Sequence, residues 1–351
     1  MGLDSALWWG KRVLVTGHTG FKGSWLTLLL KNLGADVVGL SLPPESPQSL
    51  FVDARISDQV SANFFEDIRD ELQVSNAIRI LRPDYVFHLA AQAYVRRSVR
   101  KPIESITTNI TGTANVLLSS LACESVIGVT IATTDKVYEN LGINKPFEET
   151  DKLGGVDPYS ASKAASEIIV NSINIANNPS KKRITTVRAG NVIGGGDWGE
   201  DRLVPDLVRA LFSNNLISIR NPNATRPWQH VLDCLYGYLL LAQSHLEGKE
   251  GIPTAINFGP STSLTVKELV SLFEKAFKKK ANCEYLKSSI PESEQLELNS
   301  KLAKSTLGWQ QSIPQTDAVI QTAEWYSKFA TGRDAQELML EEIANFRGGK
   351  W

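Results

Sequence analysis

The stretch Gly17-His18-Thr19-Gly20-Phe21-Lys22-Gly23 decides the fold. It lies between a short β-branched run at residues 11–16 (KRVLVT) and a helical apolar pattern at residues 21–33, which ends at Gly34. Glycine is needed where a turn brings the backbone close to a pyrophosphate, and the helix that follows offers free N–H groups. The spacing G-x-x-G-x-x-G in this context predicts a dinucleotide-binding loop. Three glycines in an ordinary strand-to-helix turn are the alternative interpretation.

The rest of the chain alternates strand and helix patterns up to residue 188. Short apolar runs at residues 36–40, 85–90, 126–133 and 184–188 alternate with helical patterns at residues 74–81, 106–123 and 159–175. This alternation predicts an α/β fold, a Rossmann-type doubly wound parallel sheet. Beyond it lie Gly-rich and polar loops (191–198, 221–227) and helical patterns at 231–245, 264–278 and 317–329.

These patterns predict two domains, as expected for 351 residues. We expect residues 1–188, with a return segment at 230–258, to form a dinucleotide-binding Rossmann domain. Residues 189–229 and 259–351 form a smaller, irregular α/β domain that binds the substrate.

Composition excludes several classes of protein. Hydrophobic residues make up 42% and charged residues 21%, and 37 Lys and Arg nearly balance 38 Asp and Glu. The net charge of −1 argues against nucleic acid and membrane surfaces as partners. No apolar run is long enough to span a membrane, and the first ten residues lack a secretory signal. Three scattered cysteines indicate a reducing, cytoplasmic compartment, and four histidines form no metal-ligand pattern, so we expect no metal.

The second strand ends without the acid that commonly holds the ribose of NAD. Residues 39–42 read GLSL, with neither a carboxylate for the 2′-hydroxyl nor an arginine for a 2′-phosphate. From these residues alone, the cofactor subtype and its affinity stay open. Asp67 follows later in the chain and either accepts a hydrogen bond from the adenine amino group or lies in a solvated loop.

Two further patterns carry chemistry. Tyr159 and Lys163 are four residues apart, so they share one helix face, and an ammonium beside a phenol favours the phenolate. Tyr159 is therefore a candidate base toward a substrate hydroxyl. Thr134, Asp135 and Lys136 follow a strand at the sheet edge where ligands bind, and they offer an acid and a potential base. A turn with a surface ion pair is the alternative interpretation.

Together these residues make the chain resemble the extended short-chain dehydrogenase/reductase family over nearly its whole length. The matching parts are the glycine loop, residues 88–92 (HLAAQ), Asn109 and Tyr159-x-x-x-Lys163. Within the family it is similar to the nucleotide-sugar 4,6-dehydratases, through Thr134-Asp135. In particular it resembles those that act on CDP-glucose, through residues 17–26 (GHTGFKGSWL), Lys136, residues 188–198 (RAGNVIGGGDW) and residues 226–231 (RPWQHV).

The resemblance implies a lyase that uses NAD as its cofactor. Tyr159 would take the proton of the sugar 4-hydroxyl while C4 is oxidised, and Thr134 would bind the 4-oxygen. Asp135 would protonate the departing 6-hydroxyl, with Lys136 as candidate base at C5, and a hydride would return to C6. The implied product is a 4-keto-6-deoxy sugar for surface polysaccharide such as O-antigen, and the implied assembly is a homodimer. The implied cofactor contacts are Gly17, His18, Thr19, Gly20, Phe21, Lys22, Gly23, Asp67, Ile68, Leu89, Ala90, Ala91, Gln92, Thr108, Tyr159 and Lys163.

The nucleotide end of such a substrate needs cations and a flat surface. Arg202, Arg226 and Arg188 are candidates for the diphosphate, because a guanidinium offers forked donors. Trp228 or Trp198 would stack on the base, unless they are core or rim residues. Asn191 would contact the phosphates or the sugar by resemblance. His88 fits the interior of a strand end better than a catalytic role.

Other functions stay open. A 4-epimerase or decarboxylase of the same fold needs Tyr159 and Lys163 but not Asp135 with a partner. A non-catalytic dinucleotide-binding protein is the more remote alternative, since such proteins usually lose the tyrosine or the lysine.

Overall fold

A seven-stranded parallel sheet forms the centre of the molecule. The computed structural model describes residues 2–140, 142, 145–286 and 296–346. The strands run in the order β11-β6-β5-β4-β1-β2-β3, and every neighbouring pair is parallel. Their bounds are β1 Arg12–Thr16, β2 Asp36–Ser41, β3 Ala62–Phe65, β4 Tyr85–His88, β5 Gly128–Ala132, β6 Arg183–Ala189 and β11 Ala255–Phe258. The predicted Rossmann-type sheet is confirmed, and its order reverses between β1 and β4.

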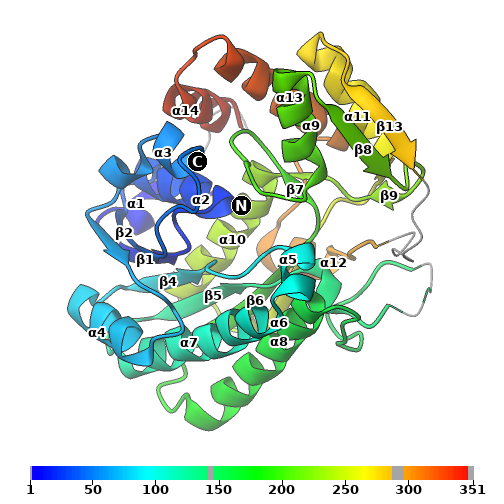
Figure 1. Ribbon diagram of the computed structural model, residues 1–351. Coiled ribbons are helices and arrows are strands. Elements are labelled where there is room, and N and C mark those ends of the chain that lie inside the picture. Colours follow the sequence, from blue (N-terminus) through cyan, green and yellow to red (C-terminus); the bar gives the residue numbers. More distant parts are fainter. Residues whose placement is uncertain (1, 141, 143–144, 287–295, 347–351) are drawn as a thin grey trace.

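Helices cover both faces of this sheet (Figure 1). The short α1 (Ser5–Trp8), α2 (Phe21–Asn32) and α10 (Val231–Leu246) lie on one side, and α4 (Glu71–Leu81), α7 (Gly112–Ala122) and α8 (Pro158–Asn177) on the other. Since β1 and β4 are the neighbours at which the strand order reverses, a crevice opens at their carboxyl ends.

The predicted helix at residues 106–123 is interrupted. It begins as α6 (Pro102–Ile106), passes through a π-helical turn, η2 (Thr107–Thr111), and continues as α7. The π turn places Asn109 against the loop after β4, where its side chain bonds the main chain of Gln92 in both directions, at 2.9 and 3.1 Å. Periodicity could not reveal this turn, because a π turn shifts the register without changing the residue types.

Several short elements of the sheet domain were not predicted. They are α3 (Leu50–Asp53), the 3₁₀ turn η1 (Ile56–Gln59), β3 and α5 (Val95–Arg100). β3 is half exposed along its length, so it lacks the apolar run of the central strands.

The carboxyl-terminal half supplies a smaller, irregular unit. Three two-stranded sheets pair β7 (Val192–Ile193) with β10 (Gln229–His230), β9 (Thr225–Arg226) with β12 (Leu264–Thr265), and β8 (Leu216–Arg220) with β13 (Asn282–Leu286). Its helices are α9 (Leu203–Ser213), α11 (Val266–Phe277) and α13 (Gln315–Ala330). α11 begins with a capping box of Thr265 and Glu268.

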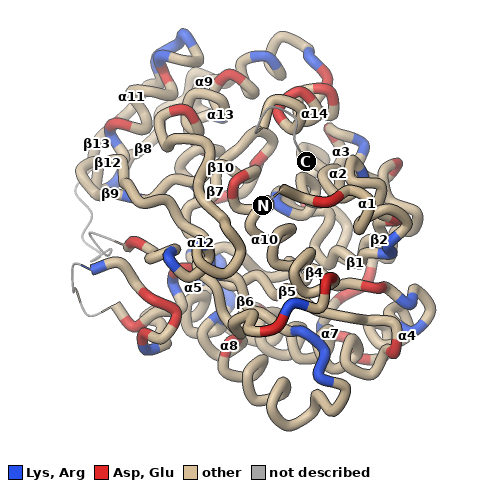
Figure 2. Tube along the Cα trace, turned by 180° about the vertical axis from the view of Figure 1, so that it is seen from behind, with Lys and Arg blue, Asp and Glu red and all other residues tan. Residues whose placement is uncertain are grey.

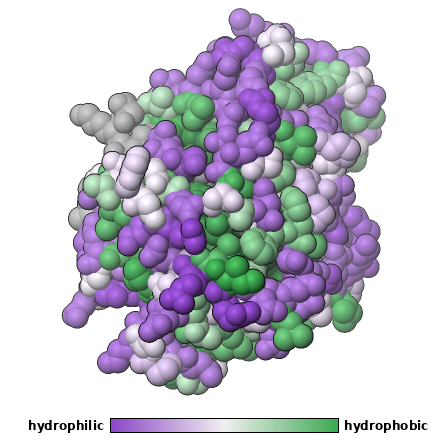
Figure 3. Space-filling view, turned by 90° about the vertical axis from the view of Figure 1, so that its left-hand side faces the viewer, coloured by the Kyte–Doolittle hydropathy of each residue, from purple (hydrophilic) through white to green (hydrophobic). Residues whose placement is uncertain are grey.

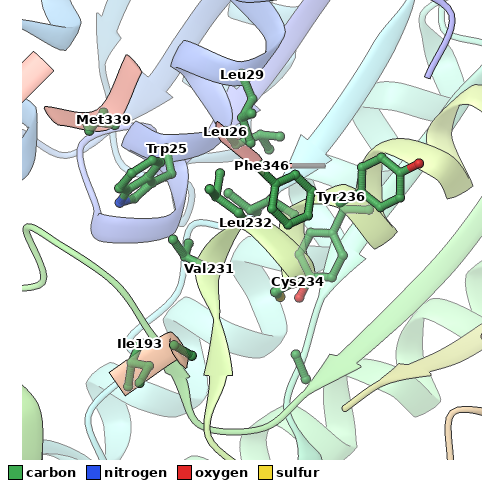
Figure 4. Close-up of a cluster of buried hydrophobic side chains, with 14 of the residues drawn as sticks. Trp25, Leu26, Leu29, Ile193, Val231, Leu232, Cys234, Tyr236, Met339 and Phe346 are labelled. Carbon is green, nitrogen blue, oxygen red and sulfur yellow. The ribbon is translucent and has the colours of Figure 1, made fainter. Parts of the chain in front are cut away.

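One core joins the two halves. In Figure 4, Trp25, Leu26 and Leu29 of α2 face Leu232 and Tyr236 of α10, with Ile193, Met339 and Phe346 around them. Two further helices connect the smaller unit to the sheet domain. α12 (Lys301–Leu307) packs on α10 and β11, and α14 (Ala335–Asn345) packs on α2 and α3. The smaller unit is therefore held firmly against the sheet domain.

The surface carries no single dominant field. Figure 2 shows Lys and Arg interspersed with Asp and Glu over the outer helices, and Figure 3 shows apolar patches separated by hydrophilic residues. In the described part of the chain, no helix combines the length and apolarity that a membrane crossing requires.

Candidate active site

Two cavities adjoin at the carboxyl ends of the strands. The first, about 530 Å³, lies over the glycine loop, and the second, about 510 Å³, lies between the sheet and the smaller unit. Both are lined by a shared wall of Phe21, Lys22, Leu89, Ala91, Ala93, Tyr94, Asp197, Glu200 and Arg202. A cofactor in the first cavity would therefore touch a substrate in the second.

The glycine loop is built for close approach. Gly17 has a φ of +75°, and a Cβ there would lie 2.6 Å from the nitrogen of Ala90. A Cβ at Gly23 would lie 2.1 Å from the oxygen of Gly17. Only glycine leaves this cradle open to a pyrophosphate, so the loop fits a dinucleotide.

Most predicted cofactor contacts line the first cavity. They are Gly17, Thr19, Gly20, Phe21, Lys22, Gly23, Asp67, Ile68, Leu89, Ala90, Ala91 and Thr108. Asp67 accepts hydrogen bonds from Nε of Arg69 at 2.9 and 3.0 Å, and these bonds lower the pKa of the carboxyl. An ionised carboxylate on this wall is a suitable acceptor for an adenine amino group.

The side chains of His18 and Gln92 do not line either cavity. The His18 ring is buried beneath the loop, with Nε2 2.7 Å from Oδ1 of Asn63, and a Cβ at Gly39 would meet it at 2.4 Å. Gln92 donates to the carbonyl of Tyr94 at 3.0 Å and so shapes the loop after β4.

The end of β2 carries a hydroxyl where related folds place an acid. Ser41 bonds Thr19 of the glycine loop at 2.8 Å between hydroxyl oxygens. Two carboxylates that sequence reasoning missed, Glu45 and Glu66, also line this cavity. Glu66 follows β3, and because β3 itself was not predicted, nothing in the sequence placed it beside the loop.

Tyr159 and Lys163 reach the second cavity from the first turns of α8. Asp157 caps the helix and Pro158 occupies its first position, which suits a helix start. Lys163 donates from Nζ to the carbonyl of Ala132 at 3.0 Å, and burial lowers its pKa to about 7. Burial raises the pKa of Tyr159, while a hydrogen bond with Thr134 and the charge of Arg202 oppose this rise.

Thr134 and Asp135 lie beside Tyr159, just past β5. Thr134 donates to Oδ1 of Asp135 at 3.0 Å, and Oδ2 has no partner among the described residues. That oxygen faces Gly190, where a Cβ would lie 3.0 Å away. Burial raises the pKa of Asp135, so the group is suited to carry a proton. Lys136 lines the same cavity with an exposed side chain.

The predicted substrate residues also line the second cavity: Asn191, Arg202, Arg226 and Trp228. Arg202 donates to Asp197 at 3.0 Å and lies over the ring of Tyr94, 5.2 Å from its centroid. Sequence reasoning missed Tyr94 and Asp197, because no local pattern links either of them to Arg202.

Two other candidate substrate residues, Arg188 and Trp198, do not line the second cavity. Arg188 is buried in an ion pair with Glu167, at 2.8 Å, and lines neither cavity. Trp198 lines the first cavity and donates from Nε1 to Asp53 at 3.0 Å. The expectation that Arg188 binds a diphosphate is therefore wrong, because its guanidinium is already paired away from the cavities.

His88 lies in the interior, as its position predicts. Its ring nitrogens bond Thr16 at 2.7 Å and Thr113 at 3.0 Å, and burial lowers its pKa to about 3. Within the residues that the structure describes, no cluster of His, Cys, Asp and Glu is arranged to hold a metal ion.

Comparisons with known proteins agree with this site. Residues 13–259 match the model of the NAD dependent epimerase/dehydratase family. The chain is 37% identical over 354 residues to CDP-glucose 4,6-dehydratase of Salmonella typhimurium, with 98% of each chain covered. The predictions of this family, of an enzyme and of NAD as its cofactor are confirmed.

Solved structures agree in fold. UDP-glucose 4-epimerase of Thermotoga maritima superposes with a TM-score of 0.79 at 24% identity, covering 91% of this chain and 99% of that one. The dTDP-glucose 4,6-dehydratase of Streptomyces venezuelae, solved with NAD bound, has a TM-score of 0.77 at 23% identity, covering 90% and 97%.

Proposed function

This chain belongs to the NAD dependent epimerase/dehydratase family, and on that premise we propose that it converts CDP-D-glucose to CDP-4-keto-6-deoxy-D-glucose with loss of water. The observation that carries the proposal is the Asp135 carboxyl. It is buried beside Tyr159 and Thr134, and its Oδ2 is unpartnered among the described residues. A 4-epimerase has no leaving hydroxyl to protonate, so an acid held at this place favours dehydration.

The first cavity is the place for NAD. The Gly17–Gly23 loop would hold the pyrophosphate, Asp67 and Ile68 the adenine end, and Tyr159, Lys163 and Thr108 the nicotinamide end. When bound, NAD accepts a hydride from C4 of the sugar and returns it to C6.

Tyr159 acts on the sugar 4-hydroxyl as base. Its phenol must lose a proton, and Arg202 and Thr134 lower its pKa against the effect of burial. Thr134 binds the 4-oxygen once the proton has gone. The 4-ketone acidifies the C5 proton, which Lys136 removes from the exposed side of the cavity.

Asp135 then gives its proton to the departing 6-hydroxyl, which leaves as water. Lys136 returns a proton to C5, and the proton that Tyr159 took from the 4-hydroxyl restores Asp135, so the cycle neither gains nor loses a proton. Burial raises the pKa of this carboxyl, so it holds a proton at higher pH than an ordinary aspartic acid. Since Oδ2 has no protein partner among the described residues, it is available to donate to a substrate oxygen.

The CDP end of the substrate would contact Arg202, Arg226 and Trp228 in the second cavity. Arg202 and Arg226 offer forked donors to the diphosphate. Trp228 is 5% exposed and belongs to the hydrophobic core, so only the part of its indole that lines the cavity would contact the base. The choice of CDP over other nucleotides rests on the 37% identical relative and on Lys136 after Asp135.

We also propose the surroundings of the reaction. The two-domain division at residues 1–188 with 230–258, against 189–229 with 259–351, agrees with the return of α10 and β11 to the sheet. Contacting helices α7 and α8 expose Leu118, Ile168 and Ile175, which suits a homodimer packed through both helices. The setting would be cytoplasmic supply of a deoxysugar for surface polysaccharide such as O-antigen.

Product analysis tests the proposal. The protein is incubated with CDP-glucose, dTDP-glucose, UDP-glucose or GDP-mannose, with and without added NAD, and products are weighed by mass spectrometry. We expect loss of one water from CDP-glucose. Loss of water from another nucleotide sugar would support dehydration but show that the substrate carries a different nucleotide. A product of unchanged mass would indicate a 4-epimerase.

A further inference from the structure

One buried carboxylate outside the cavities is bonded on all sides. Glu167 of α8 accepts from the hydroxyl of Thr133 at 2.6 Å and from the hydroxyl of Thr186 at 2.7 Å. Arg188 adds two bonds, from Nε at 2.9 Å and from Nη2 at 2.8 Å. The Glu167 side chain is 4% exposed, so these four donors replace water completely.

Glu167 is the third member of a row on α8. Tyr159, Lys163 and Glu167 follow at intervals of four residues, so all three lie on the face of the helix that packs on β5 and β6. Burial and the charge of Lys22 on α2 lower the pKa of Lys163, and the Glu167 charge raises it. The helix therefore places a negative charge one turn behind the ammonium that serves the site.

Two residues of this row form hydrogen bonds with consecutive residues at the end of β5. Lys163 donates to the carbonyl of Ala132, and Glu167 accepts from the hydroxyl of Thr133. Thr133 itself lines the substrate cavity, together with Thr134 and Asp135, the next two residues along the chain. Thr133 is thus the direct link between the buried carboxylate and the dehydration residues.

Stability alone does not call for this arrangement. Removing a buried ion pair from water costs free energy, and well-packed apolar side chains of similar volume often do as well. Thr186 bonds Glu167 from β6 and lines neither cavity, so only one of the two hydroxyls on the carboxylate, that of Thr133, belongs to a residue of the site. Removing each threonine hydroxyl in turn can therefore distinguish a role of Glu167 in the reaction from a role in folding.

We propose that Glu167 is a positioning residue of the dehydration site: it holds the Thr133–Asp135 turn through Thr133 and places a carboxylate one helical turn from the Lys163 ammonium. The inference deepens the proposed function and rests on it for the dehydration step. The effect of Glu167 on Lys163 does not depend on the proposed reaction and can be measured without substrate.

The matched variants Thr133→Val and Thr186→Val test whether Glu167 positions the Thr133–Asp135 turn. Each removes one hydroxyl from the same carboxylate, and a hydrogen bond to a charged group is worth enough for about a tenfold change in rate. We expect Thr133→Val to slow product formation from CDP-glucose about tenfold and to raise the steady-state fraction of reduced cofactor, because elimination lags behind oxidation. Thr186→Val should change both quantities less than about threefold. Equal effects of the two variants would overturn the positioning role.

The variant Glu167→Gln tests the charge. The enzyme is labelled with ¹³C at Cε of lysine, and the Lys163 signal is identified by its loss in Lys163→Met. We expect this signal to titrate near pH 7 in the unaltered chain and about one pH unit lower in Glu167→Gln. An unchanged midpoint would overturn the link to Lys163.

A double variant is used in case Glu167→Gln does not fold. Glu167→Gln leaves Arg188 buried without its partner, so Glu167→Gln/Arg188→Gln removes both charges and is titrated in the same way. If the chain releases no product from CDP-glucose, the proposed function fails. The lysine titration then still decides whether Glu167 supports Lys163.

Discussion

The two cavities that meet at Arg202 are built by different means. The first is shaped by backbone: Gly17 and Gly23 leave room where any Cβ would meet main-chain atoms at 2.6 and 2.1 Å. The second is shaped by side chains from separate parts of the chain, among them Asp135, Tyr159 and Arg226. A backbone site is specified by a short local pattern, whereas a side-chain site exists only when distant segments come together. Substitutions should therefore damage the first cavity by strain and the second by lost chemistry.

The largest effect should come from Tyr159→Phe in the second cavity. Removing the phenolic oxygen removes the base for the 4-hydroxyl, and such a base contributes about a thousandfold to the rate. We expect product formation from CDP-glucose to fall by about this factor, measured by mass spectrometry of timed samples.

The matched control for this prediction is Tyr285→Phe. Tyr285 lies on β13 with 47% of its surface exposed, and it lines neither cavity. Turnover by Tyr159→Phe at the rate of this control would show that Tyr159 is not the base.

Asp135→Asn should come next. The amide has the same shape but cannot give a proton to the 6-hydroxyl, so we expect elimination to slow about a hundredfold. Oxidation at C4 should continue, since Tyr159 and Lys163 are intact. Rapid-mixing absorbance of the reduced cofactor should rise without decay. A variant that neither oxidises nor eliminates would contradict this division of labour.

The first cavity should respond to Gly17→Ala. Gly17 and Gly10 have similar backbone angles, at +75° and +72°, but a Cβ at Gly10 meets nothing within 4 Å. Each alanine costs about 1–2 kcal/mol of strain. The further collision with Ala90 should weaken NAD binding about tenfold or more in Gly17→Ala alone, measured by titration calorimetry. Equal NAD affinity in both variants would mean that close approach at Gly17 does not matter.

The smallest effect concerns stability against pH. Burial raises the pKa of Asp135 above its unfolded value, so the native state binds the proton more tightly. Stability is then lost as pH rises from the unfolded pKa through the folded pKa. We expect Asp135→Asn to melt at a higher temperature than the unaltered chain at pH 7, and the gap to narrow as pH falls toward 4. A constant gap across this range would contradict the raised pKa.

Local patterns predicted what local physics controls. The strand, glycine loop and helix at residues 12–32 were placed correctly, because periodicity and glycine positions act over a few residues. The π turn at residues 107–111 and the edge strand β3 escaped prediction, because register shifts and half-exposed strands leave little trace. Glu66 was missed with β3, although it lines the first cavity.

The sequence by itself determined the parallel sheet, the phosphate loop and the chemistry available at Tyr159 and Asp135. Only the tertiary structure decided which arginine reaches which place. Arg188 and Arg226 read alike, yet Arg188 ends in a buried bond to Glu167 while Arg226 lines the second cavity. The reason is physical: a guanidinium satisfies whichever carboxylate or ligand the fold brings near, and that neighbour comes from a distant segment.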